Sequence, residues 1–140
     1  MGQYSAEDVA EFIIVESKND NNPVDNLRLQ KMLFFLWVEY YKEKKMYLFD
    51  DDIEAWKYGP VVPVVYWKYR QFVSNPIILD CGLKLKDDDA AFLKSKIKKL
   101  NRESTSSLIQ RSHDFKAWKD AFNKGYRSKM SYNSIKESVD

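Results

Sequence analysis

The apolar residues between positions 26 and 45 predict a helix that is buried on most of its circumference. From Met32 to Tyr41 only Glu39 is charged, and a helix that is apolar all round belongs at the centre of a small domain. Lys44 and Lys45 mark its end, where cations interact favourably with the helix dipole. The sequence therefore predicts that this helix is the core of the fold.

Amphipathic periods and capping residues predict the other elements. The expected helices cover residues 5–17, 26–45, 63–72, 87–100, 108–113 and 131–139, with another amphipathic turn or two at 115–123. Residues 53–57 are expected to be extended and to pair with residues 46–48 or 77–79. The predicted fold is mainly α: a compact single-domain helical bundle, spanning residues 1–140, of about six helices with room for one small β-hairpin or two-stranded sheet.

A stiff turn is expected between Tyr58 and Pro63. Gly59 can adopt a positive φ, and Pro60 and Pro63 each fix φ and remove a backbone donor. Aromatic side chains crowd this turn, and we expect them to form a surface of fixed shape: Trp56, Tyr58, Tyr66, Trp67 and Tyr69.

Composition narrows the class of protein. The 140 residues suffice for one domain, and the aromatic content of 15% is high enough that some rings should line a groove or an interface. The lone Cys81 cannot close an internal disulfide and is expected to be a small, half-buried structural residue. With neither a secretory signal nor an apolar run long enough to cross a membrane, the expected location is the cytoplasm.

Charge is distributed unevenly along the chain. Between Lys94 and Lys129 there are eleven basic and three acidic residues. Such a region could bind nucleic acid, bind an acidic protein, or only face water. The spacing of lysines around Leu93, Ile97 and Leu100 fits the solvated side of an amphipathic helix.

Catalytic and cofactor motifs are missing from the sequence. No nucleophile is paired with a base, and no cluster has metal-ligand spacing. Gly59-Pro60 is not a phosphate-binding loop, because proline lacks the amide hydrogen that such loops present. A single histidine, His113, does not make a metal site. We therefore expect no catalytic residues, no metal, no cofactor and no enzymatic activity.

The order of motifs resembles the Panacea domain family, a group that includes phage-associated proteins and antitoxins of bacterial toxin-antitoxin pairs. Three motifs carry the resemblance: a Leu-x-Leu-Gln-Lys helix, an Ala-Trp-x-x-Gly-Pro-Val segment, and a hydroxyl-His pair followed by Trp. Here they are Leu27, Leu29, Gln30, Lys31, Met32 and Leu33, then Ala55, Trp56, Gly59, Pro60 and Val61, then Ser112, His113 and Trp118. Ser112 stands where the family usually has Thr, and Ala117 where Pro often precedes the Trp.

The resemblance implies a mainly helical protein that binds a cognate toxin, encoded by an adjacent gene, and neutralises it without chemistry of its own. Two alternatives stay open. One is a prophage-associated regulator that binds nucleic acid through the basic C-terminal half. The other is an adaptor that engages a host protein or a protease. No membrane partner is expected.

Nine residues are candidates for partner binding: Trp56, Tyr58, Gly59, Pro60, Val61, Tyr66, Trp67, His113 and Trp118. His113 is expected to end a helix and to hydrogen-bond a backbone carbonyl of the Tyr-Gly-Pro turn, with Trp118 packed beside it. The same two residues would also serve as one wall of a toxin-binding groove. Trp56 fits the core as well, whereas Tyr58 and Trp67 are the expected hot spots, because Trp and Tyr dominate such positions.

Overall fold

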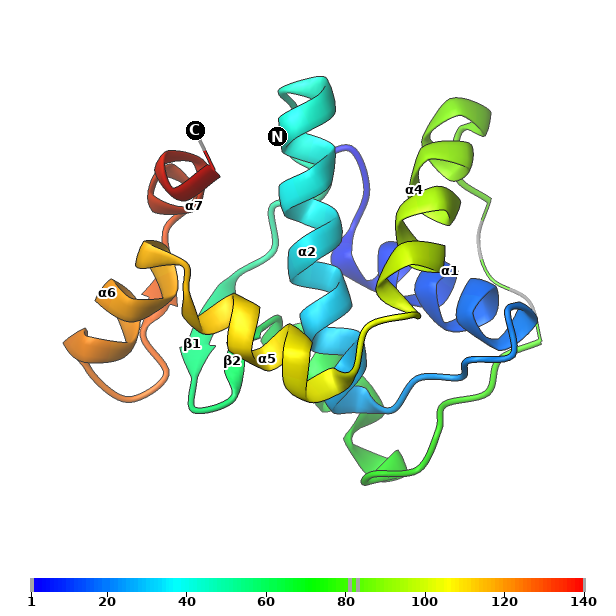
Figure 1. The fold of residues 1–140 in the computed structure, drawn as a ribbon, viewed down its shortest axis with the longest axis horizontal. Helices are drawn as coiled ribbons and strands as arrows, with labels where there is room; N and C mark the ends of the chain where they lie inside the picture. Colours follow the sequence, from blue (N-terminus) through cyan, green and yellow to red (C-terminus); the bar gives the residue numbers. More distant parts are fainter. Residues whose placement is uncertain (1, 81, 83, 140) are drawn as a thin grey trace.

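The computed structural model describes residues 2–80, 82 and 84–139, and within these ranges it is mainly α with one small sheet (Figure 1). In chain order the elements are α1 (Ala6–Asn19), α2 (Asn26–Lys44), β1 (Ile53–Trp56), β2 (Gly59–Val61), α3 (Pro63–Tyr69), the 3-10 helix η1 (Arg70–Phe72), α4 (Asp87–Leu100), α5 (Thr105–His113), α6 (Lys116–Lys124), β3 (Lys129–Met130) and α7 (Tyr132–Val139). The predicted fold class is confirmed. Cys81 lies outside the described residues.

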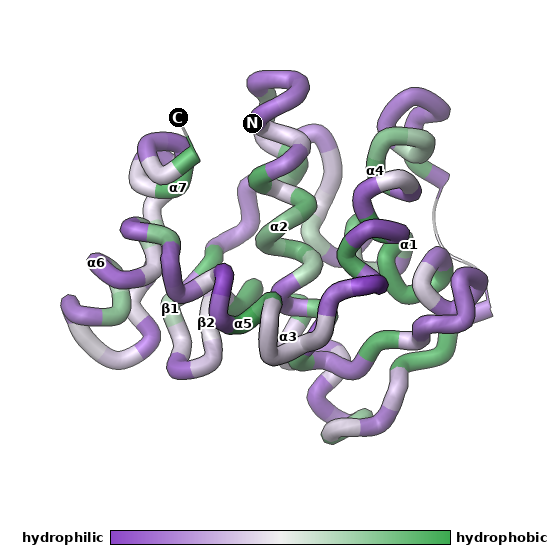
Figure 2. The backbone as a smooth tube through the Cα atoms, viewed as in Figure 1, coloured by the Kyte–Doolittle hydropathy of each residue, from purple (hydrophilic) through white to green (hydrophobic). Residues whose placement is uncertain are grey.

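Helix α2 runs through the middle of the molecule and packs against α1, α4, α5 and α7 (Figure 1). Every residue from 29 to 38 is buried, and for residues 32–38 the apolar pattern predicts this. Figure 2 shows hydrophobic segments concentrated on α1 and α2. The exposed residue near the start of α2 is Leu27, at 38%, and this end of the helix lies beside the sheet.

Capping side chains set the helix boundaries. The Asp25 carboxylate accepts a hydrogen bond from the Arg28 backbone N–H at 2.8 Å, which satisfies a donor that has no partner within the helix. The Ser104 hydroxyl does the same for Ser107 at 3.1 Å. Ser104 caps α5, which begins at Thr105. The break between α4 and α5 is therefore shorter than the predicted one at residues 102–107.

The sheet differs from the predicted pairing. Its strand order is β2-β1-β3, all antiparallel, so residues 53–57 pair with neither 46–48 nor 77–79. Glu54 lies opposite Val61 on one side and Lys129 on the other. The turn between β1 and β2 consists of Lys57 and Tyr58, and a link this short makes the next segment the nearest partner for β1.

The two segments proposed as partners of β1 are hydrogen-bonded elsewhere. Tyr47 accepts a backbone hydrogen bond from Gln3 at 2.9 Å, and Ile77 donates one to Val24 at 2.8 Å. The segment around Tyr47 therefore binds the N-terminal residues, and the segment around Ile77 binds the loop between α1 and α2. None of the helices in the described ranges is long and apolar enough to cross a membrane.

Candidate functional site

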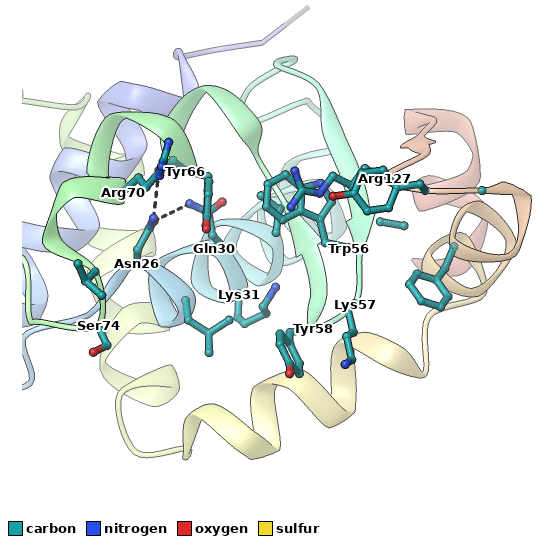
Figure 3. A pocket seen from close by; sticks show the side chains of 17 residues that line it. Asn26, Gln30, Lys31, Trp56, Lys57, Tyr58, Tyr66, Arg70, Ser74 and Arg127 are labelled. Carbon is teal, nitrogen blue, oxygen red and sulfur yellow. Dashed lines mark hydrogen bonds between the residues drawn. The ribbon is translucent and has the colours of Figure 1, made fainter.

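A groove of about 1010 Å³ opens beside the β1–β2 hairpin (Figure 3). Four parts of the chain line it: the first turns of α2, the hairpin, the end of α3 with the residues that follow it, and the connection from α6 to β3. Its lining residues are Asn26, Leu27, Gln30, Lys31, Ala55, Trp56, Lys57, Tyr58, Val61, Tyr66, Arg70, Val73, Ser74, Phe122, Gly125, Tyr126 and Arg127. We call this feature the groove.

Two side chains of α2 hold the outer edge of β2. Lys31 Nζ donates to the Pro60 carbonyl oxygen at 2.6 Å, and Gln30 Oε1 accepts from the Val62 backbone N–H at 2.8 Å. Both side chains are buried. Since Pro60 has no N–H of its own, this edge of the sheet is bonded to the helix and is closed to another strand.

A chain of buried hydrogen bonds continues from this edge to α3. Gln30 Nε2 donates to Asn26 Oδ1 at 3.0 Å, and Asn26 Nδ2 donates to the Tyr66 carbonyl at 3.0 Å. Figure 3 shows Asn26 between Gln30 and Tyr66. A fully connected buried network of this kind rigidifies the elements that it joins, which here are α2, the hairpin and α3.

Gly59 has no room for a side chain. Its φ is +113°, a region that L residues rarely adopt. A Cβ at this position would lie 2.6 Å from Ser112 Oγ and 3.0 Å from Lys31 Nζ. The expected rigid turn is thus shifted by one residue: Lys57 and Tyr58 make the turn, while Gly59 and Pro60 belong to the buried strand β2.

His113 and Trp118 hold the opposite side of the hairpin. Trp118 Nε1 donates to the Trp56 carbonyl at 3.0 Å, and the His113 ring lies near the Lys57 backbone, although its buried Nε2 has no hydrogen-bond partner among the described residues. The two rings stack with centroids 4.1 Å apart. His113 therefore ends α5 and packs against Trp118, whereas its hydrogen bond to a carbonyl of the turn stays a prediction.

Burial changes the charge state of two of these residues. Lys31 is fully buried, and desolvation lowers its pKa from 10.5 to about 7. Burial also lowers the pKa of His113; the nearby Lys57 backbone opposes this effect, and the nearby Lys31 charge adds to it. His113 is therefore mainly neutral at pH 7.

Eight of the nine predicted site residues fall into two groups. Four of them line the groove: Trp56, Tyr58, Val61 and Tyr66. Four others lie behind it and position the hairpin: Gly59, Pro60, His113 and Trp118. The motif residues therefore build the rigid back of the groove as well as part of its surface.

Two aromatic residues are placed differently from the expectation. Tyr69 is only 4% exposed and packs in the core instead of on the aromatic surface. Trp67 is 51% exposed but is not among the lining residues; its ring packs edge-on against Tyr66, with centroids 5.3 Å apart. Trp67 thus flanks the groove. Its role as a hot spot stays a prediction.

Most lining residues were not among the predicted site residues. They include Asn26, Leu27, Arg70, Val73, Ser74, Phe122, Gly125, Tyr126 and Arg127. A local signal exists for Asn26 and Leu27, which share a helix face with Gln30 and Lys31 at spacings of four. The segment around Tyr126 has no such signal, because only the packing of α6 against β1 brings it to the hairpin.

The basic residues between Lys94 and Lys129 lie on several elements. They are distributed over α4, α5, α6, β3 and the connections that carry Arg102 and Arg127. Several are paired with carboxylates: Lys96 with Glu39, Arg111 with Glu103, Lys116 with Asp120 and Lys129 with Asp52. This arrangement fits solvated helix surfaces better than a track for nucleic acid. Among the described residues, no group of three or more His, Cys, Asp or Glu side chains could hold a metal ion.

Comparison with known proteins agrees with these motifs. Residues 29–119 match the family model described as antitoxin SocA-like, Panacea domain. Antitoxin SocA of Caulobacter vibrioides is 39% identical over 67 residues, which cover 48% of this chain and 34% of that protein. The matched part thus spans about a third of the relative's length. No solved structure matches the chain. The family model covers well over half of the chain, which therefore belongs to the SocA-like antitoxin family with a Panacea domain.

Proposed function

We propose that this chain is an antitoxin-like domain that neutralises a cognate toxin by binding it directly through the groove, without catalysis. The toxin is expected to be a protein encoded by an adjacent gene. Membership of an antitoxin family supports a toxin partner in general. The direct contact and the use of the groove are the new parts of the proposal.

The observation that carries the proposal is a rigid hairpin that presents exposed rings to solvent. Tyr58 sits at the hairpin turn and is 56% exposed, while the backbone on both sides of it is held by hydrogen bonds from Lys31 and Trp118. A ring that is already fixed in place loses little conformational freedom on binding. Exposed Tyr and Trp side chains of this kind dominate protein interfaces.

Co-expression in bacteria tests the proposal. The product of the neighbouring gene is expressed from an inducible promoter, with and without this chain, and growth is measured. We expect the toxin candidate to stop growth and the chain to restore it. Purified components should then form a stable complex in size-exclusion chromatography.

Matched variants show whether the groove makes the contact. Tyr58→Ala should weaken the complex by about 2 kcal/mol, whereas Ile78→Ala, which removes a side chain that is 50% exposed outside the groove, should have no effect. Rescue without a complex would refute direct binding. A complex that is equally stable with Tyr58→Ala and with a further groove variant, Tyr126→Ala, would place the contact elsewhere.

A further inference from the structure

We infer that the groove recognises an acidic peptide segment of its partner, one that inserts an aromatic or aliphatic side chain between the exposed rings and places carboxylates against the surrounding cations. This inference rests on the proposed function and specifies the chemistry of the partner at that site.

The charges in the groove are all of one sign. Its charged lining residues are Lys31, Lys57, Arg70 and Arg127, and none of the Asp and Glu residues that the structure describes lines it. The chain as a whole carries nearly balanced charge, with 23 basic and 21 acidic residues. The excess of positive charge is therefore a local property of the groove. A groove with one sign of charge attracts a partner of the opposite sign and disfavours partners of the same sign.

The three cations at the groove surface lack carboxylate partners and lie on aromatic rings instead. The Arg127 guanidinium is 3.7 Å from the centroid of the Trp56 ring. Arg70 lies 5.2 Å from that of Trp67, and Lys57 5.5 Å from that of Tyr58. None of the three forms an ion pair within the described part of the chain. These contacts hold the cations in place and leave their donors available for incoming carboxylates.

The groove also gathers exposed apolar side chains. Of the nine large apolar residues that are exposed in the described ranges, five line the groove: Leu27, Tyr58, Val73, Phe122 and Tyr126. Three of these are aromatic and two are aliphatic. An apolar pocket surrounded by cations fits a peptide that carries a large apolar anchor flanked by Asp or Glu.

Recognition at the β2 edge of the groove depends on side chains of the peptide and not on strand addition. The outer edge of β2 cannot add a strand, because Pro60 has no N–H and both the Pro60 carbonyl and the Val62 N–H are already bonded to α2. The specificity of the groove for a peptide therefore depends on the charge of the peptide and on its apolar anchor side chain.

A nucleic acid fits the groove less well than a peptide does. Aliphatic side chains such as Leu27 and Val73 offer no stacking surface to a base. The densest run of lysines, from Lys94 to Lys99, lies on α4 and does not line the groove. A backbone of phosphates would need a continuous basic track, and the lining residues provide none.

A display library of random peptides about 12 residues long, which extend to roughly 40 Å, tests the inference with the whole chain as bait. Selected sequences should be enriched in Asp and Glu around one Trp, Phe, Tyr or Leu. The best peptide is then synthesised with a fluorophore and its binding is measured by anisotropy, together with an isosteric version in which Asn and Gln replace Asp and Glu. We expect the neutral version to bind at least about tenfold more weakly.

Charge-reversal variants localise the site. Arg127→Glu and Arg70→Glu should each reduce affinity for the acidic peptide by about tenfold or more, while Lys119→Glu, an exposed residue of α6 outside the groove, should change it by less than about twofold. Circular dichroism confirms folding of each variant. The inference would be overturned if the library showed no enrichment or enriched neutral or basic peptides. It would also be overturned if the groove variants bound the acidic peptide as tightly as the unmodified chain, or if single-stranded oligonucleotides competed equally well. Self-association that blocks the groove, seen by analytical ultracentrifugation, would also overturn it in favour of a second copy.

This test separates the inference from the proposed function. If the chain rescues growth and Arg127→Glu and Arg70→Glu rescue equally well, the acidic segment is refuted while the antitoxin function stands. If acidic peptides bind the groove but the neighbouring gene product neither stops growth nor binds the chain, the chemistry of recognition stands and the proposed function fails.

Discussion

Lys31→Met replaces a fully buried amine at the back of the groove with an apolar side chain of similar length. The ammonium form of Lys31 is costly because the surrounding atoms are apolar or already bonded, and one carbonyl, that of Pro60, accepts its hydrogen bond. Its pKa falls from 10.5 to about 7 for this reason. The unfolded chain regains the ordinary value.

The lowered pKa predicts how stability depends on pH. Between pH 7 and pH 9 the unfolded chain keeps the Lys31 proton, whereas the folded chain loses it, so the unfolded state binds more protons and the free energy of unfolding rises with pH. Two pH units within this window correspond to a rise of roughly 2 kcal/mol. Below pH 7 the contribution becomes constant, because the residue is protonated in both states.

Urea denaturation followed by tryptophan fluorescence measures this rise. We expect the free energy of unfolding of the unmodified chain to increase by roughly 2 kcal/mol from pH 7 to pH 9, and Lys31→Met to remove most of the increase. His113 also has a lowered pKa but titrates mainly below pH 7, so His113→Gln should retain the rise. The argument would be refuted if the free energy of unfolding of the unmodified chain stayed constant from pH 7 to pH 9. It would also be refuted if this free energy rose equally steeply with pH in Lys31→Met.

Three further outcomes are expected. Tyr58→Ala and Trp67→Ala should each weaken partner binding by about 2 kcal/mol in calorimetry without loss of structure; unchanged affinity in a folded double variant would contradict this. Gln30→Leu should lower the free energy of unfolding by roughly 2 kcal/mol, because the buried Val62 N–H then lacks its acceptor; a urea midpoint equal to that of the unmodified chain would show that another group replaces it. Val73→Gly should raise the urea midpoint, since Val73 has a φ of +56° and relief of that strain, about 1 to 3 kcal/mol, exceeds the entropy cost of glycine; a lower midpoint would show that no strain is stored there.

Local patterns were sufficient for the helices. The continuous apolar run in α2 predicts a central helix because burial on all sides requires apolar residues on all sides, and residues 32–38 are buried as expected. Caps such as Asp25 act through hydrogen bonds to residues three positions along the chain, so they too are visible in the sequence. The prediction of a stiff turn between Tyr58 and Pro63, crowded by aromatic side chains, follows from the fixed φ of proline in the same way.

Contacts between distant segments were decided only by the tertiary structure. β1 pairs with β3 across more than seventy residues, and no local pattern specifies that partner. The groove joins four segments of the chain, so the sequence by itself indicated Trp56, Tyr58, Val61 and Tyr66 but not the cations around them. Lys31 is the clearest case: a lysine is expected in water, yet the closure of β2 onto α2 buries it. The sequence by itself determined which segments are helical, because helix formation depends on near neighbours; the tertiary structure decided which charges lie unpaired around the groove, because that depends on residues brought together from far apart.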